Sequence, residues 1–469
     1  MRTRLCYLAL VLVPLVAYGP LLWQSYGTPE DFLRLAGETD GVQHGILHSA
    51  LVDISFHFVN DVAAFAWLRA LALLLVVLCG VALWQLFERG GWSAWDAAAA
   101  ALGVVLLPSA QLFVGWGPTW PAVLAGLLSV AGFAAAESEL EPAGPRRFVG
   151  MLGGAMLYFA AAMCFLPNAV LALVPLAALT FARPLRFADQ LGKWFASHVG
   201  LMLLGIGAAW AIDRWMMSDV GLADRTSLAE RLVSLFTFSV PSSWATFLVG
   251  EQSAMRVVCA VIALAVLTMI VLSARQQTKD DPRVQTAWLL AVLGPSVLFA
   301  LIVVLSPHWQ PGYRTIWPLA GVVVVALAAA VRGVGDRPGK KPFWHFAAFG
   351  GLVVVAALAA GAQAHRYFAE PLRDEWSTMR AAVMRANFTG DTRVVLVTGS
   401  ETRASVDALF VTSAHRDGEA AKAMFRAALR DRFPSGLPRN QRVDVEAAAQ
   451  APVEPGANTL IFDLRQPVR

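Results

Sequence analysis

Eleven apolar segments, each close to the length of a bilayer-crossing helix, dominate this chain of 469 residues. A helix needs roughly 20 predominantly apolar residues to cross the hydrocarbon layer of a membrane. The predicted spans are 5–23, 64–87, 94–113, 119–136, 148–165, 167–182, 194–212, 255–273, 285–305, 315–332 and 343–363. Only 15% of the residues are charged, against roughly 25% in soluble proteins. The sequence therefore predicts an α-helical polytopic membrane protein with about 11 transmembrane helices.

The distribution of Arg and Lys over the connections predicts how these spans are oriented. Every second connection carries Arg or Lys, from Arg89 alone in one to several in others, whereas the connections near Gly115 and Pro167 contain no Arg or Lys. Because positive residues concentrate in cytoplasmic loops, the N-terminus is predicted to be cytoplasmic and the C-terminus to lie on the outer side. The net charge of +4 fits this bias and does not indicate nucleic-acid binding. Two alternatives stay open: residues 148–182 as one kinked span, which would reverse everything after it, and the first span as a cleaved signal peptide.

The composition changes after Ala364, which divides the chain into a transmembrane part, 1–364, and a part of ordinary soluble character, 365–469. Apolar runs bounded by turn residues predict buried strands in the second part, and helical periodicity predicts helices there. The predicted strands are 394–397 and 459–462, and the predicted helices are 376–386 and 419–432. We therefore expect a small C-terminal α/β extracytoplasmic domain.

The first of three predicted outer loops, 24–63, begins with an acidic pair, Glu30 and Asp31, directly after Pro29. Polar residues beside a membrane face are costly and commonly functional. A carboxylate in this position can deprotonate an acceptor hydroxyl as a general base, or hold a divalent cation such as Mg or Mn against a phosphate. The alternative is helix capping by Asp31 or its neighbour Thr28, because acids favour helix N-termini.

Apolar residues recur at helical spacing between Ile46 and Val62, which predicts one or two interfacial helices lying along the membrane. Another interfacial helix is predicted in the second outer loop, 213–253. His44 and His48 are four residues apart and so share a helix face, as paired zinc ligands do. Because no Glu follows His44, ordinary interfacial histidines are the alternative.

The third outer loop, 306–314, ends in Arg314, with Tyr313 and His308 beside it. A guanidinium at the membrane interface is well suited to bind a phosphate or pyrophosphate. Snorkelling of this side chain to lipid headgroups is the alternative. Arg69 near the outer end of the second span, and Arg225 in the second outer loop, are candidates for the same role.

A short connection rich in proline, glycine and tryptophan joins the third and fourth spans. It runs Phe113-Val114-Gly115-Trp116-Gly117-Pro118-Thr119-Trp120-Pro121. Trp116 is a candidate for stacking against a sugar or guiding a lipid. An aromatic belt at the membrane surface is the alternative.

Together these features resemble the multispanning C-type (GT-C) membrane glycosyltransferases, and among them the bacterial O-antigen glucosyltransferase group and its uncharacterised relatives. The shared pieces are the acidic motif Pro29-Glu30-Asp31-Phe32, the aromatic turn from Leu107-Pro108 to Trp120-Pro121, the hairpin Leu166-Pro167-Asn168-Ala169, and Tyr313-Arg314-Thr315 before a late span. The likeness covers roughly residues 5–380. Those proteins often carry two adjacent aspartates where this chain has Glu30-Asp31, so a carboxylate is kept at both positions.

The resemblance implies a multi-pass enzyme of the bacterial inner membrane that moves a sugar from a polyprenyl-phosphate donor to a glycan, lipid or protein acceptor on the extracytoplasmic face. It implies Asp31 as the catalytic base or metal-associated acid, Glu30 as its companion and Arg314 as a phosphate contact. The further substrate-side candidates are Arg69, Arg225, His44, His48, His308, Tyr313 and Trp116. A lipid-linked donor requires no nucleotide-binding domain, and the sequence shows none. A requirement for Mg or Mn is left open.

Three other functions stay open on the sequence alone. A transporter or flippase for lipid-linked glycans would place ionisable groups at mid-membrane, whereas here they gather in the outer loops. A polymerase or ligase would share the outer site and the lipid-linked substrate, although its usual signature is one large arginine-rich loop. A non-catalytic scaffold for envelope assembly is the third alternative.

Overall fold

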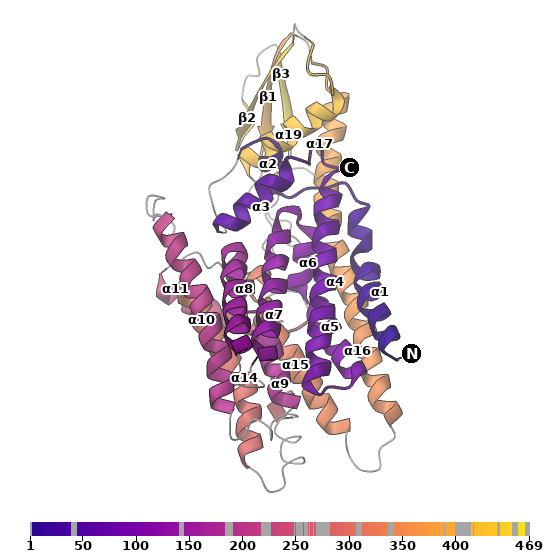
Figure 1. Cartoon of the computed structure of the whole chain (residues 1–469). Coiled ribbons are helices and arrows are strands. Elements are labelled where there is room, and N and C mark those ends of the chain that lie inside the picture. The colour runs from indigo at the N-terminus through magenta and orange to yellow at the C-terminus, as the bar shows by residue number, and fades with distance from the viewer. Residues whose placement is uncertain are drawn as a thin grey trace.

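The computed structural model describes most of the chain as helices packed side by side (Figure 1). The described residues are 2–38, 45–139, 145–182, 191–216, 227–247, 282–305, 312–335, 342–388, 390–398, 414–415, 417–438, 441–452 and 458–464, with isolated positions between 249 and 268. The long or apolar helices are α1 (Arg2–Leu22), α4 (Phe65–Gly90), α5 (Ala94–Val105), α6 (Pro108–Gly115), α7 (Trp120–Glu139), α8 (Pro145–Ala169), α9 (Leu173–Ala182), α10 (Leu191–Met216), α14 (Pro282–Leu305), α15 (Trp317–Gly335) and α16 (Pro342–Gln363).

Six stretches of these helices are long and apolar enough to cross a membrane: Arg2–Leu22, Phe65–Gly90, Gly117–Glu137, Phe148–Ala169, Gly192–Met216 and Gly350–Arg385. The predicted third span is a pair of helices, α5 and α6, bent by 57° at a short break. The structure therefore supports a multi-pass membrane protein. Ten of the predicted spans coincide with described helices, and most of 255–273 lies outside the described residues. The figure of eleven stays a prediction.

The hairpin predicted near Pro167 is a reversal of the chain between α8 and α9. Helix α8 is broken at Phe165, whose φ of −164° and ψ of 104° are not helical. Helix α9 then returns toward the end of the bundle where α4 ends, because Trp92 donates a hydrogen bond of 2.9 Å to the carbonyl of Ala178. Since α8 also starts at that end, after α7, this geometry favours a hairpin over one kinked span.

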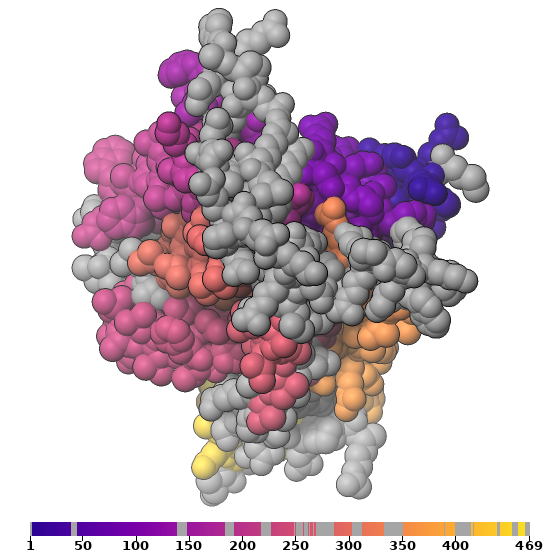
Figure 2. Space-filling view, turned by 90° about the horizontal axis from the view of Figure 1, so that it is seen from below, coloured from indigo at the N-terminus to yellow at the C-terminus, as the bar shows by residue number. Residues whose placement is uncertain are grey.

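Short helices cover the opposite end of the bundle, which we call the α2 end. They are α2 (Pro29–Leu35) and α3 (Ile46–Phe56), whereas α11 (Leu228–Ser234) lies beside α10 (Figure 1) and α12 (Val240–Trp244) packs against α15. All four occupy the first two predicted outer loops, where interfacial helices were expected. In Figure 2, seen from the other end, the N-terminal helices (indigo to violet) and the middle helices (magenta) lie on opposite sides of the bundle.

Arg69, on α4, fixes the chain where it leaves α1 and turns toward α2. Its side chain is 1% exposed. Nη1 donates to the carbonyls of Leu21 (2.9 Å) and Gln24 (2.7 Å), Nη2 donates to that of Tyr26, and the guanidinium lies 3.7 Å from the Tyr26 ring centroid. The last carbonyls of a helix lack partners within it and carry partial negative charge. A cation at this position therefore satisfies the end of α1 and orders the loop beyond it.

A continuous helical stretch joins the C-terminal part to the bundle. Helix α16 continues through Ala364–Ala369 into α17 (Glu370–Arg385), so the predicted boundary at 364/365 falls inside a continuous helical stretch. Beyond it stand strands β1 (Asp391–Val397), β2 (Arg442–Ala448) and β3 (Thr459–Asp463) and helix α19 (Gly418–Arg432). The sheet is parallel in the order β2-β1-β3. The second half of its central strand, Val394–Val397, is apolar and buried at every position, as expected of a strand covered on both faces.

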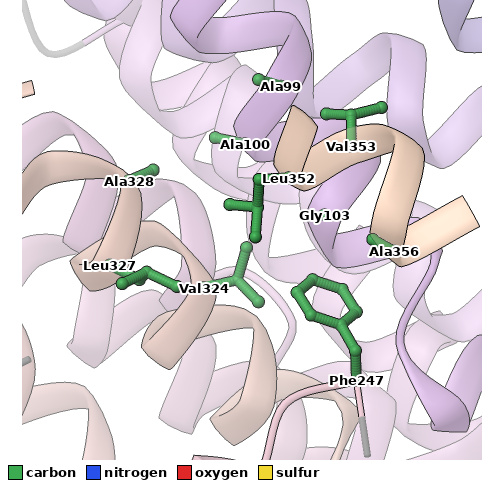
Figure 3. A pocket seen from close by; sticks show the side chains of 10 residues that line it. All are labelled: Ala99, Ala100, Gly103, Phe247, Val324, Leu327, Ala328, Leu352, Val353 and Ala356. Atoms are coloured by element: carbon green, nitrogen blue, oxygen red, sulfur yellow. The ribbon is translucent and has the colours of Figure 1, made fainter. Parts of the chain in front are cut away.

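A small pocket lies between α5, α15 and α16, with Phe247 at its edge (Figure 3). All of its lining residues are apolar, Val324 and Leu352 among them, and its volume is about 10 Å³. A cavity needs about 10–15 Å³ of such volume to hold one water molecule. The pocket is therefore too small for a sugar or a lipid chain.

Candidate functional site

Helix α2 begins with a capping box that joins Thr28 and Asp31. Oδ2 of Asp31 accepts hydrogen bonds from the backbone N–H (2.6 Å) and the hydroxyl (3.0 Å) of Thr28, and Thr28 Oγ1 accepts from the Asp31 N–H (3.3 Å). Pro29 occupies the first turn, where its missing N–H costs nothing. The capping interpretation is therefore confirmed, and the local sequence Thr-Pro-Glu-Asp is its cause.

Capping uses only one of the two oxygens of Asp31. The side chain is 1% exposed, and Oδ1 makes no hydrogen bond within the described part of the chain. Burial raises the pKa of this carboxyl to about 6, although the Thr28 hydrogen bonds and the Arg69 cation act in the opposite direction. Asp31 is therefore a carboxyl group that gains and loses its proton close to neutral pH, with one oxygen left for another partner.

The aromatic turn between α6 and α7 lies directly against that oxygen. A Cβ added to Gly117 would lie 3.0 Å from Asp31 Oδ1, so only glycine allows this approach without a shift. The turn is itself held in place, because Thr119 Oγ1 donates to the Trp116 carbonyl (2.7 Å) and Trp120 Nε1 donates to Ser55 Oγ (3.1 Å) on α3. Nε1 of Trp116 is buried and has no hydrogen-bond partner among the described residues.

Arg314 approaches the same turn from a short helical stretch, Tyr313–Thr315, before α15. Its Cζ lies 5.8 Å from the centroid of the Trp116 ring. Burial lowers the pKa of the guanidinium below its ordinary range, and the Glu30 carboxylate raises it in part. Ser109 Oγ on α6 donates to the Tyr313 carbonyl (2.5 Å), which fixes the stretch that carries the arginine.

His48, on α3, is the next ionisable group in this neighbourhood. Its side chain is 2% exposed, and its Nδ1 lies 3.1 Å from the Cys164 carbonyl, beside the break in α8. A carbonyl only accepts hydrogen bonds, so Nδ1 carries the proton. Burial, together with the Arg34 and Arg314 cations, lowers the pKa of His48 to about 4, although the hydrogen bond to the Cys164 carbonyl acts in the opposite direction. The ring is therefore neutral at neutral pH.

The structure brings together five of the residues that the sequence singled out: Asp31, Glu30, Trp116, Arg314 and His48. Tyr313 supplies its carbonyl to Ser109, and its ring packs edge-on against Phe238 with centroids 5.6 Å apart. Arg69 donates to backbone carbonyls and acts on Asp31 through its charge. His44, Arg225 and His308 lie outside the described residues.

Two contributors escaped the sequence analysis. Gly117 was seen only as part of an aromatic turn, although a glycine between Trp116 and Pro118 is a signal for close backbone approach. Tyr26 was not considered, and its hydroxyl donates to the Gly115 carbonyl at the end of α6 (3.1 Å). Both residues join the first outer loop to the turn, a contact that sequence spacing alone does not reveal.

The described residues contain no group of three His, Cys, Asp or Glu side chains placed to hold a metal ion. Asp31 and Glu30 are the carboxylates at the site. Mg²⁺ commonly binds through one or two carboxylates together with substrate phosphates and water. The donor set therefore suits a divalent cation that arrives with a phosphate.

No protein-family model matches the chain, and no curated protein matches its sequence. Among solved structures, the archaeal oligosaccharyltransferase AglB from Archaeoglobus fulgidus, in complex with an inhibitory peptide and a dolichol-phosphate, is similar at 13% identity and a TM-score of 0.47. The match covers 87% of this chain and 63% of AglB, so this chain spans less than two thirds of that protein's length.

ArnT from Cupriavidus metallidurans bound to undecaprenyl phosphate is similar at 12% identity and a TM-score of 0.46, over 89% of this chain and 87% of ArnT. A further structure of the Archaeoglobus fulgidus oligosaccharyltransferase, in complex with Zn and sulfate, matches at 13% identity and a TM-score of 0.43. With TM-scores below 0.5, these likenesses assign neither family nor activity. The proposed function therefore rests on the geometry of the site.

The buried Asp31 carboxyl predicts an unusual dependence of stability on pH. Its folded pKa of about 6 lies above the ordinary value of 3.8, so ionisation opposes folding by about 3 kcal/mol once both states are charged. This stabilising contribution of the protonated form is complete below pH 4 and is lost as the pH rises through 6. Asp31→Asn, which keeps an acceptor for Thr28, should therefore unfold at a higher temperature than the wild type above pH 6 and at a similar temperature below pH 4.

Thermal unfolding in detergent between pH 4 and 8 measures this difference, and Glu230→Gln is the matched control. Glu230 forms the same capping box with Ser227 on α11, but it is exposed, and its hydrogen bonds to Ser227 lower its pKa. Its replacement should give no gain in stability above pH 6. Equal unfolding temperatures for Asp31→Asn and the wild type at every pH would contradict the proposed environment of Asp31.

Proposed function

We propose that this protein is a membrane glycosyltransferase of the GT-C type, which moves a sugar from a polyprenyl-phosphate donor to an acceptor hydroxyl at the extracytoplasmic face. The observation that carries the proposal is the pairing, at one end of the bundle, of a buried carboxyl of pKa about 6 with a partly buried arginine. A base and a phosphate-binding cation are the two groups that this transfer needs. The O-antigen glucosyltransferase group is the subclass that we propose from the sequence motifs.

Asp31 acts as the general base in this proposal. Its unpartnered Oδ1 takes the proton of the acceptor hydroxyl while the acceptor oxygen forms a bond to the anomeric carbon of the sugar. The bond between that carbon and the phosphate oxygen breaks, and its electron pair leaves with the polyprenyl phosphate. A base with a pKa near the working pH is well matched to this task.

Arg314 receives the phosphate in the same step. Its guanidinium is planar and forked, so two of its N–H groups can donate to one phosphate. Charge that develops on the leaving phosphate is stabilised more strongly here than in water, because the site is largely buried. Glu30, whose charge acts on Arg314, orients the cation.

This site contains two buried polar atoms, Oδ1 of Asp31 and Nε1 of Trp116, that have no hydrogen-bond partner among the described residues. Buried polar atoms are almost always hydrogen-bonded in folded proteins. One is an acceptor and the other a donor, and a sugar hydroxyl can satisfy either kind. Trp116 is accordingly proposed as the sugar-binding residue, and His48, neutral at neutral pH, as a further hydrogen-bonding group for the acceptor.

The transporter alternative receives less support from the spans. The ion pair between His198 and Glu137, with Nε2 and Oε2 3.0 Å apart, lies close to the end of α7 that is remote from α2. Transporters usually bind their cargo near the bilayer midplane, on broken helices. The perturbed carboxyl and arginine instead sit together at the α2 end, which suits chemistry at a membrane surface.

Asp31→Asn should abolish transfer, since an amide cannot take the acceptor proton, and a fall of about a hundredfold or more in kcat is expected. Purified protein, a polyprenyl-phosphate-linked sugar and a glycolipid acceptor fraction provide the assay. In the wild type, kcat should fall as the pH drops through about 6, because the base becomes protonated. Glu30→Gln should lower kcat less and keep this pH dependence. Full activity of the purified Asp31→Asn protein would remove the proposed base.

The two arginines, Arg314 and Arg69, should respond differently to replacement. Arg314→Gln should raise KM for the donor and lower kcat by about tenfold or more, because it removes a phosphate contact. Arg69→Met should instead lower the unfolding temperature, because it leaves the carbonyls of Leu21 and Gln24 without their donor. Donor titrations and thermal unfolding of both proteins test this, and an unchanged donor KM in Arg314→Gln would contradict the phosphate role.

A further inference from the structure

The far end of α2 is held by helix α19 of the C-terminal part. Both Nη atoms of Arg430 lie 3.2 Å from the carbonyl of Leu35, the last residue of α2. One turn earlier on α19, Arg426 forms an ion pair with Glu38, just beyond α2. A cation at a helix C-terminus satisfies carbonyls that lack partners within the helix and matches the sign of the helix dipole.

Helix α17 holds the middle of α2. The ring of Phe32, the residue after Asp31, stacks on Trp376 with centroids 5.6 Å apart and planes at 29°. Helices α17 and α19 are tied to each other, because Arg380 Nε donates to Asp431 Oδ2 (2.5 Å). The two helices therefore form one support for the helix that carries the acidic pair.

Helix α2 has seven residues, and a helix this short is not stable by itself. Its position depends on the groups that it touches. The Thr28 cap sets its start, but Leu35 and Glu38 are fixed from the C-terminal part. A change in α19 at Leu35 therefore reaches Asp31, four residues earlier, through about one turn of backbone.

We propose that Arg426 and Arg430 are positioning residues, through which the C-terminal domain holds Asp31 and Glu30 in register with Arg314 and so controls sugar transfer. This inference rests on the proposed function of Asp31. The side chains of Arg426 and Glu38 are 42% and 37% exposed, and an exposed ion pair contributes little to global stability. Arg426 and Arg430 therefore contribute more to the position of α2 than to the free energy of unfolding.

The double variant Arg426→Gln/Arg430→Gln tests this, with Lys422→Gln as the matched control. Lys422 lies one turn before Arg426 on α19 and pairs with Glu419 of the same helix (2.8 Å). Hydrogen exchange of the α2 backbone amides, followed by mass spectrometry, reports the order of α2 without reference to activity. We expect exchange in α2 to rise about tenfold in the double variant and to stay unchanged in Lys422→Gln.

Kinetics of the same proteins give the second readout. Loosening of α2 should admit water to Asp31, so the acid limb of the kcat profile should move from about 6 toward the ordinary range of aspartate. We expect kcat to fall about tenfold, because a misplaced base loses much of its effect, with little change in donor KM. A merely structural role would lower the unfolding temperature and leave the acid limb in place, and that result would overturn the proposal.

Exchange of the two charges provides a rescue. Glu38→Arg combined with Arg426→Glu should recover part of the α2 protection that either single replacement loses, as expected for a direct pair. If α2 protection and the acid limb are unchanged in the double glutamine variant while Asp31→Asn is inactive, the positioning role is wrong and the proposed function stands. If Asp31→Asn transfers sugar normally, control of transfer through α2 is overturned together with the proposed function, whatever the exchange data show.

Discussion

The removal of the Asp31 carboxyl group from water is the interaction on which the rest of the site depends. A buried carboxyl costs free energy when it ionises, and the surrounding structure is arranged to accommodate that cost. Thr28 donates two hydrogen bonds to Oδ2, the Arg69 cation favours the charged form, and Gly117 leaves room for Oδ1. The result is a carboxyl with a pKa of about 6. Its Oδ2 is hydrogen-bonded within the fold, and its Oδ1 is available to a ligand.

Rigid support explains how so short a helix can present a reactive group. Arg69 fixes the chain before α2, the turn at Gly117 lies beside it, and α17 and α19 hold its middle and its end. Arg314 is fixed independently through the carbonyl of its neighbour Tyr313. Because the base and the cation rest on different elements, their separation is set by the packing of the bundle as a whole. This is the kind of preorganisation that transfer chemistry requires.

The sequence predicted which residues form the site better than it predicted the contacts between those residues. An acidic pair after the first span, an aromatic turn and an arginine before a late span all pointed to one end of the bundle, since alternate connections of a polytopic protein share a face. Whether Arg69 would bind a ligand or the backbone could not be read from its position, because that depends on where α1 ends. Strand β2 was missed because its sequence, Arg-Val-Asp-Val-Glu, is that of a half-exposed edge strand with little apolar content. The contact of α19 with α2 joins residues almost 400 positions apart, and no local pattern encodes such a pair.

Mass spectrometry of envelope polysaccharides and glycolipids is the direct test of whether Asp31 is the base in sugar transfer. Cells that carry the wild type, a deletion and Asp31→Asn would be compared, with the membrane level of the variant protein verified. We expect one sugar to disappear from the same glycan in both the deletion and the Asp31→Asn cells. A sugar that is lost in the deletion but retained in Asp31→Asn would contradict it, because the protein would then be needed for that glycan without using Asp31 as a base.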